Sequence, residues 1–244
     1  MSRIPRVFVD QAVAGGSLRL AADAAAHLVR VLRLRPGADV VLFDGSGTEY
    51  PGRVRAATRR SVDIDVGPGT STDRESPLVL TLLQGVCRAE RMDLVVRKAT
   101  ELGVAAIRPV LAGRSVVRLD AERAARRLAH WRAIVVSACE QCGRSYLPEL
   151  LEPLPLAEAL AAHAGAVGVL LDPDAVTGAD ALAPPGAAPL ALLVGPEGGL
   201  TEAEREVARA AGFTGIRLGP RILRTETAAL VGIALLQARF GDLC

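Results

Sequence analysis

The chain has 244 residues, of which 50% are hydrophobic and 23% are charged. This composition excludes a disordered protein and suits one large α/β domain or a small domain joined to a larger one. The formal net charge is only +2 and aromatic residues make up 3%. Contact with nucleic acid therefore requires local basic patches, and RNA recognition on extended aromatic platforms is not expected.

The apolar runs and the cysteines exclude further classes. The longest apolar runs, such as residues 78–83 and 190–194, have the length of buried strands and are too short to span a bilayer. Residues 1–10 lack the apolar core and cleavage site of a signal peptide. We therefore expect a cytoplasmic protein without a membrane segment. Four cysteines are too few for a disulfide framework in a chain of this size.

The N-terminal part of the chain predicts a small β-rich domain. The expected strands are residues 6–9, 40–43, 52–56 and 62–66. A helix is expected at residues 21–32, ending before the Arg35-Pro36-Gly37 sequence. Asp44-Gly45 is typical of a hairpin turn. A segment rich in Gly, Ser, Thr and Pro follows, and we place the first domain at residues 1–70.

The remaining residues, 71–244, predict a second domain in which strands alternate with helices. The expected strands are residues 78–86, 107–111, 166–171, 190–194 and 215–218. The expected helices are residues 91–102, 121–142, a segment after Thr201, and 226–240. This alternation predicts an α/β fold with a mostly parallel sheet and helices on both faces.

A glycine-rich loop directly follows the strand at residues 190–194. It reads Gly-Pro-Glu-Gly-Gly-Leu, and Thr201 and Glu204 then form a capping box that specifies the start of a helix. Glycines at the carboxyl end of a strand let the backbone approach a ligand closely. A tight turn would explain the glycines alone, but Glu197 among them favours a functional site.

A second loop of the same design follows the strand at residues 215–218. In residues 219–227 an apolar pair, Ile222 and Leu223, lies between Arg221 and Arg224. The apolar pair suits an adenine ring, and the arginines suit phosphate or substrate. Thr225 is predicted as the N-cap of the last helix.

Several motifs in chain order resemble the ribosomal RNA uracil-N3 methyltransferase family, RsmE. They are KATELGV, CEQCGR, GPEGG before a capped helix, LGPRILRTETAAL and QARFGDL, while HLVRVLRLRPG and LFDGSG resemble the N-terminal module of that family. The resemblance covers essentially the whole chain. It implies a PUA-like, RNA-binding β-barrel followed by an α/β domain of the SPOUT superfamily with a trefoil knot.

The same resemblance implies an enzyme that uses S-adenosylmethionine, acts as a homodimer and methylates N3 of a uridine in 16S rRNA of the small ribosomal subunit. The residues that match the cofactor-binding loops of the family are Gly195, Glu197, Gly198, Gly199, Leu218, Gly219, Arg221, Ile222 and Leu223, with Leu171 at the end of a preceding strand. We assign Arg224 to stabilising negative charge on the uracil and Glu197 to accepting its proton.

Other polar residues are candidates for contact with the RNA. They are Arg30, Arg33, Arg114, Glu140, Gln141 and Arg144. A helix terminus capped at Gly143 explains the segment around Glu140 equally well. No metal site is expected, because Cys139 and Cys142 are accompanied by no second cysteine pair or histidine cluster.

Alternative functions remain open at this point. An RNA-binding or ribosome-assembly protein with this fold would show the same N-terminal arginines, and a methyltransferase acting on a different RNA nucleotide would show the same loops. A thiol oxidoreductase built on Cys139 and Cys142 is disfavoured, since the pair ends a helix instead of opening one.

Overall fold

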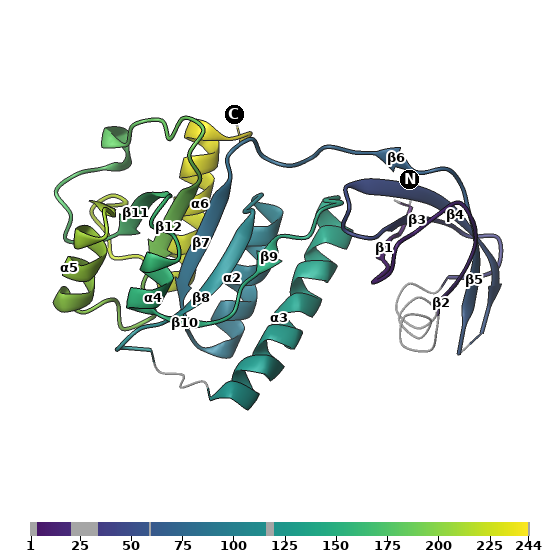
Figure 1. Cartoon of the computed structure of the whole chain (residues 1–244), viewed down its shortest axis with the longest axis horizontal. Helices are drawn as coiled ribbons and strands as arrows, with labels where there is room; N and C mark the ends of the chain where they lie inside the picture. The colour runs from purple at the N-terminus through teal and green to yellow at the C-terminus, as the bar shows by residue number, and fades with distance from the viewer. Residues whose placement is uncertain (1–3, 21–33, 59, 116–119, 244) are drawn as a thin grey trace. The chain divides into compact units, whose positions relative to one another are not determined.

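The computed structural model describes residues 4–20, 34–58, 60–115 and 120–243. Within them the chain forms two compact units (Figure 1). The first contains the residues up to Glu75 together with Cys139–Leu147, and the second contains Ser76–Ala138 and the chain from Pro148 onward. The predicted helix at residues 21–32, with Arg30 and Arg33, lies outside the described residues.

The first unit is built on a sheet of mostly antiparallel strands. They are β1 (Arg6–Phe8), β2 (Gly16–Leu20), β3 (Asp39–Phe43), β4 (Thr48–Ala57), β5 (Val62–Val66) and β6 (Thr70–Ser71). The order is β1-β3-β4-β5-β2, with β6 beside β4. Alternate residues such as Leu42 and Ile64 form the apolar core, as expected for strands with one buried face. Strand β2 was not predicted, because most of its residues are not fully buried and its sequence has no apolar run.

A segment from late in the chain completes the first unit. Arg6 of β1 donates to the carbonyl oxygen of Arg144 at 3.0 Å and to the hydroxyl of Ser145 at 3.2 Å. The backbone N–H of Phe8 donates to the Glu140 carboxylate at 3.1 Å. These contacts join residues more than a hundred positions apart, which local sequence patterns do not report.

The second unit contains one parallel sheet and its helices, including α3 up to Ala138. The elements are β7 (Leu80–Gly85), α2 (Ala89–Glu101), β8 (Ala106–Leu111), α3 (Ala121–Cys142), β9 (Glu149–Leu150), β10 (Leu154–Pro155), α4 (Leu156–Ala161), β11 (Val167–Leu171), η1 (Ala179–Ala181), β12 (Leu190–Val194), α5 (Glu202–Ala210), β13 (Thr214–Ile216) and α6 (Thr225–Phe240). The strand order is β10-β8-β7-β12-β11-β13, with β9 beside β8, and every pair is parallel. The predicted α/β architecture is therefore confirmed.

Helices cover both faces of this sheet. Leu193 of β12 packs in one cluster with Leu160 of α4 and Ala208 of α5. The neighbouring Leu192 faces the other way, toward Gly232 of α6, where an added Cβ would lie 3.1 Å from its side chain. A sheet buried on both faces explains why β12 is a continuous apolar run. Within the described part of the chain, no helix has the length and apolar character needed to cross a bilayer.

Candidate active site

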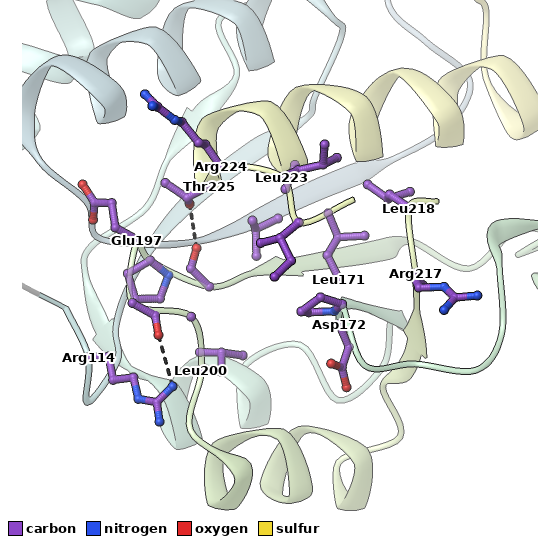
Figure 2. Close-up of a pocket in the computed structure, with 18 of the residues that line it drawn as sticks. Arg114, Leu171, Asp172, Glu197, Leu200, Arg217, Leu218, Leu223, Arg224 and Thr225 are labelled. Carbon is purple, nitrogen blue, oxygen red and sulfur yellow. Dashed lines mark hydrogen bonds between the residues drawn. The ribbon is translucent and has the colours of Figure 1, made fainter. Parts of the chain in front are cut away.

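A cavity of about 430 Å³ lies where β11, β12 and β13 end. Because parallel strands end at the same edge of a sheet, the loops that follow them meet there. Leu171 at the end of β11 and Leu218 and Leu223 from the loop between β13 and α6 line this space (Figure 2). The residues predicted to bind the cofactor line it, with the exception of Gly219: they are Leu171, Gly195, Glu197, Gly198, Gly199, Leu218, Arg221, Ile222 and Leu223.

Two glycines of the first loop are required by its geometry. A Cβ on Gly198 would lie 2.9 Å from the Cβ of Arg114, which is closer than real Cβ contacts, and 3.2 Å from its carbonyl oxygen. Gly199 has a φ of 68°, a conformation that other residues rarely adopt. The loop can therefore pack against Arg114 only with glycine at position 198, whereas glycine at position 199 is favoured by its backbone conformation. The Arg114 guanidinium in turn donates to the Gly198 carbonyl at 3.2 Å.

The predicted capping box at the start of α5 is confirmed. The Thr201 hydroxyl accepts from the Glu204 N–H at 3.2 Å, and the Glu204 carboxylate accepts from the Thr201 N–H at 2.8 Å. Glu204 also accepts from the N–H of Gly113 at 2.7 Å. Burial raises the pKa of Glu204, but these N–H donors outweigh burial and lower its pKa. One carboxylate thus joins the loop after β8 to the loop after β12.

Thr225, predicted as the N-cap of the last helix, is instead its first residue. The N-cap is Arg224, whose side chain makes no capping hydrogen bond. The Thr225 hydroxyl donates to the carbonyl of Gly195 at 2.6 Å, as the dashed line in Figure 2 shows, and accepts from the Gln84 amide at 2.9 Å. The N-cap prediction was wrong because the Thr225 hydroxyl bonds to Gly195 and Gln84, which are distant in the sequence, and not to the N–H groups of the helix.

The two predicted catalytic residues both line the cavity. One oxygen of Glu197 accepts from the N–H of Arg88 at 2.8 Å and lies 3.7 Å from the Arg91 guanidinium. Its other oxygen is buried and has no hydrogen-bond partner among the described residues. The exposed guanidinium of Arg224 extends toward the same side of the view as the Glu197 carboxylate (Figure 2).

Several cavity residues were not identified from the sequence. They are Arg91, Asp172, Arg205 and Arg217. Asp172 is almost fully buried, accepts from Arg209 at 2.9 Å and lies 3.7 Å from Arg205. The sequence could have identified Asp172 by its position, since it directly follows strand β11 as the glycine-rich loops directly follow their strands.

The other predicted RNA-contacting residues, apart from Arg114, do not line the cavity. Glu140 contacts Phe8 of the first unit, and the buried Arg144 pairs with Glu75 of the same unit. Gln141 is exposed at the end of α3. Arg30 and Arg33 lie outside the described residues.

The arginines on the strands of the first unit are paired with carboxylates. Arg53 lies 3.7 Å from Asp39, and Arg55 lies 3.7 Å from Asp65. These carboxylates offset the positive charge of the strand arginines. In contrast, Arg217, Arg221 and Arg224 at the cavity have no side-chain partner among the described residues.

Burial, together with the nearby carboxylates of Glu197 and Glu226, raises the pKa of the Cys87 thiol to about 12. A side-chain hydrogen bond with Cys142 and, after it, burial likewise raise the pKa of the Cys139 thiol. Neither is a reactive thiolate. Across the described residues, no group of three or more His, Cys, Asp or Glu side chains is arranged to hold a metal ion.

Comparisons with known proteins match this architecture. Residues 74–237 match the RNA methyltransferase domain family, and residues 20–67 match the RNA methyltransferase PUA domain family. The ribosomal RNA small subunit methyltransferase E of Buchnera aphidicola is 30% identical over 99% of this chain and 98% of its own.

Two solved structures are similar over the whole chain. A putative methyltransferase from Legionella pneumophila, in complex with the cofactor SAM, has a TM-score of 0.95 and 34% identity over 99% of this chain and 100% of its own. A ribosomal RNA small subunit methyltransferase E from Neisseria gonorrhoeae, bound to S-adenosyl methionine, has a TM-score of 0.92 and 37% identity over the same shares. The chain therefore belongs to the ribosomal RNA small subunit methyltransferase E family, as an rRNA methyltransferase with an N-terminal PUA domain and a SPOUT methyltransferase domain.

Proposed function

We propose that this enzyme transfers the methyl group of S-adenosylmethionine to N3 of a uridine in 16S rRNA. The observation that carries the proposal is the cavity at the ends of β11, β12 and β13, which the two glycine-containing loops enclose. Solved relatives with this fold are bound to the same cofactor. We propose that residues 71–244 carry out the transfer and that residues 1–70 contribute to RNA binding in the cytoplasm.

The residues of the cavity fit the cofactor. Its volume of about 430 Å³ lies within the range of about 300–1,000 Å³ usual for small-molecule sites. Leu171, Leu218 and Leu223 offer apolar contacts for an adenine ring, and the glycine loop allows close approach of backbone N–H groups. Ile222 is 87% exposed and contributes less to such a pocket than the sequence suggested. When bound, the cofactor supplies an electrophilic methyl group on a sulfonium.

Chemistry at uracil N3 requires loss of the imide proton and alignment of the nitrogen with the methyl group. Glu197 suits the first task, since one of its oxygens is buried without a partner among the described residues. The N3 proton passes to this carboxylate, the nitrogen forms a bond to the methyl carbon, and the carbon–sulfur bond breaks to leave S-adenosylhomocysteine. Alignment alone can supply effective molarities of about 10⁵ M or more, so a weak base suffices.

Arg224 suits stabilisation of the charge that develops on the uracil oxygens. Its guanidinium is exposed beside the cavity and has no described partner to neutralise it. Loss of one such donor typically lowers kcat by about 10²-fold or more. We expect Arg224→Ala to show this loss while its Kd for S-adenosylmethionine stays at the wild-type value. Normal turnover in this variant would remove Arg224 from the mechanism.

We also propose that the enzyme is a homodimer that uses α6 as its interface. Residues 228–236 of the helix are apolar around its whole circumference, which is typical of a helix with no face left to solvent. In the single chain, however, Val231 of α6 is 42% exposed and Thr227 is also exposed. A second copy of the chain would cover this apolar side.

The decisive experiment measures methyl transfer from labelled S-adenosylmethionine to small ribosomal subunits that lack native modification, followed by mass spectrometric mapping. One N3-methyluridine in 16S rRNA is the expected result. Methylation of a different nucleotide would change the substrate but keep the enzyme class. Cofactor binding without any transfer would favour the alternative of an RNA-binding or assembly protein.

A further inference from the structure

A buried glutamine outside the cavity connects its two loops. Gln84 near the end of β7 is fully buried and is not among the residues that line the cavity. Its amide nitrogen donates to the Thr225 hydroxyl at 2.9 Å and to the Gly85 carbonyl at 3.0 Å. The Thr225 hydroxyl donates to the Gly195 carbonyl at 2.6 Å. Gly195 opens the first loop, and Thr225 follows the last residue of the second.

The donor and the acceptor of each of these three hydrogen bonds are determined. The Gly85 carbonyl can only accept, so the Gln84 atom that contacts it must be the NH₂ group and not the amide oxygen. Thr225 has a single hydroxyl hydrogen, and Gly195 presents a carbonyl that can only accept it. Gln84, Thr225 and Gly195 therefore form an ordered relay with one possible arrangement of protons.

The usual role of a threonine at a helix start does not explain Thr225. An N-cap hydroxyl accepts from exposed helix N–H groups, whereas this hydroxyl donates to a loop carbonyl and the helix has no side-chain cap. The Thr225 hydroxyl therefore bonds to the first loop and to Gln84, and it does not cap the helix. Gly85 also packs closely against Pro196 of the same loop, since an added Cβ would lie 2.5 Å from the proline nitrogen.

We infer that Gln84 and Thr225 are positioning residues that hold the two cofactor loops in binding geometry before the cofactor arrives. This inference rests on the proposed use of the cavity for S-adenosylmethionine. A loop ordered in advance loses less conformational entropy on binding, which increases affinity. Removal of the relay leaves buried donors and acceptors unpaired and lets the loops separate.

The test compares matched variants by calorimetric titration with S-adenosylmethionine. Thr225→Val keeps the shape but removes the hydroxyl, and Gln84→Met keeps the length but removes the donor. We expect either change to raise the Kd about tenfold, which corresponds to about 1.4 kcal/mol. Thr225→Ser keeps the hydroxyl and restores wild-type affinity.

Thr100→Val is the control for loss of a buried hydroxyl elsewhere. Thr100 is fully buried in α2 and donates to the Val96 carbonyl at 2.9 Å, but it does not line the cavity. We expect this variant to lower the Tm and leave the cofactor Kd unchanged.

The outcomes separate this inference from the proposed function. If the wild-type protein does not bind S-adenosylmethionine, the proposed function itself fails. If the wild-type protein binds and both Thr225→Val and Gln84→Met bind equally well, the positioning role is overturned. Should Thr225→Val fail to fold, Gln84→Met tests the same hydrogen bond from the other side. A loss of affinity in Thr100→Val equal to that in Thr225→Val would also overturn the inference, since it would reflect general destabilisation.

Discussion

Substitution of Gly85 by alanine tests whether the packing of β7 against the first loop shapes the cavity. Gly85 is buried at the end of β7. A Cβ there would lie 2.5 Å from the nitrogen and 2.6 Å from Cδ of Pro196, and 2.9 Å from the carbonyl carbon of Gly195. Two of these atoms belong to the backbone, so the clash can be relieved only by displacing the loop.

Overpacking of a buried site typically costs about 1–3 kcal/mol. In a chain of this size, a loss of 2 kcal/mol lowers the Tm by roughly 4–8 °C. Because the displaced loop forms part of the cavity, we also expect the Kd for S-adenosylmethionine to rise about tenfold or more. Differential scanning calorimetry and isothermal titration calorimetry measure the two effects.

Gly165→Ala is the matched control. A Cβ on Gly165 meets no atom within 4 Å, and its backbone does not require glycine. We expect its stability to be unchanged or slightly increased, since alanine restricts the unfolded chain. If Gly85→Ala matched this control in both Tm and Kd, the contact between β7 and Pro196 would not shape the cavity.

Three further changes probe other parts of the molecule. Burial raises the pKa of Glu49, but hydrogen bonds from Arg6 and Ser145 and the charges of Arg6 and Arg74 outweigh it and hold the pKa below 4.5. Glu49→Gln should therefore lower the free energy of unfolding by about 2 kcal/mol at pH 7. In urea titrations this difference should shrink as the pH falls from 4.5 through the lowered pKa; a constant difference would contradict the assigned ion pair. Arg221→Gln should weaken RNA binding and reduce the slope of the logarithm of the binding constant against the logarithm of the salt concentration by about 1. Arg53→Gln should change neither quantity, because Arg53 is paired with Asp39. Equal effects of the two variants in filter-binding assays would argue against the pairing. Val231→Glu should raise the dimer dissociation constant about thirtyfold or more, the effect of losing about 2 kcal/mol; an unchanged sedimentation profile would place the interface elsewhere.

Sequence patterns were sufficient for the features that depend on near neighbours. The buried strands at residues 190–194 and 78–86 follow from continuous apolar runs, and the α5 capping box follows from Thr201 and Glu204. The positions of both cavity loops follow from glycines placed directly after strands. The family resemblance drawn from these motifs is confirmed by the comparisons over the whole chain.

The ion pairs of the first unit could not be predicted from local sequence patterns. The sequence shows Arg53 and Asp39 fourteen positions apart, and they meet only because β3 and β4 are antiparallel in one particular register. A shift of that register would pair other residues and leave a different set of charges exposed. The register of the strands, and not the number of arginines, therefore decides which of these positive charges lie beside a carboxylate.

The division between sequence and tertiary structure follows from the distance over which each interaction acts. Helix periodicity, buried strands and glycine turns are local, so the sequence by itself determined the α/β architecture and the location of the cavity loops. Only the tertiary structure decided that Thr225 donates to Gly195, that Cys139–Leu147 completes the first unit, and that Asp172 lines the cavity. Each of these depends on which distant segments come together, because a polar side chain takes the partner that the fold brings within hydrogen-bonding distance.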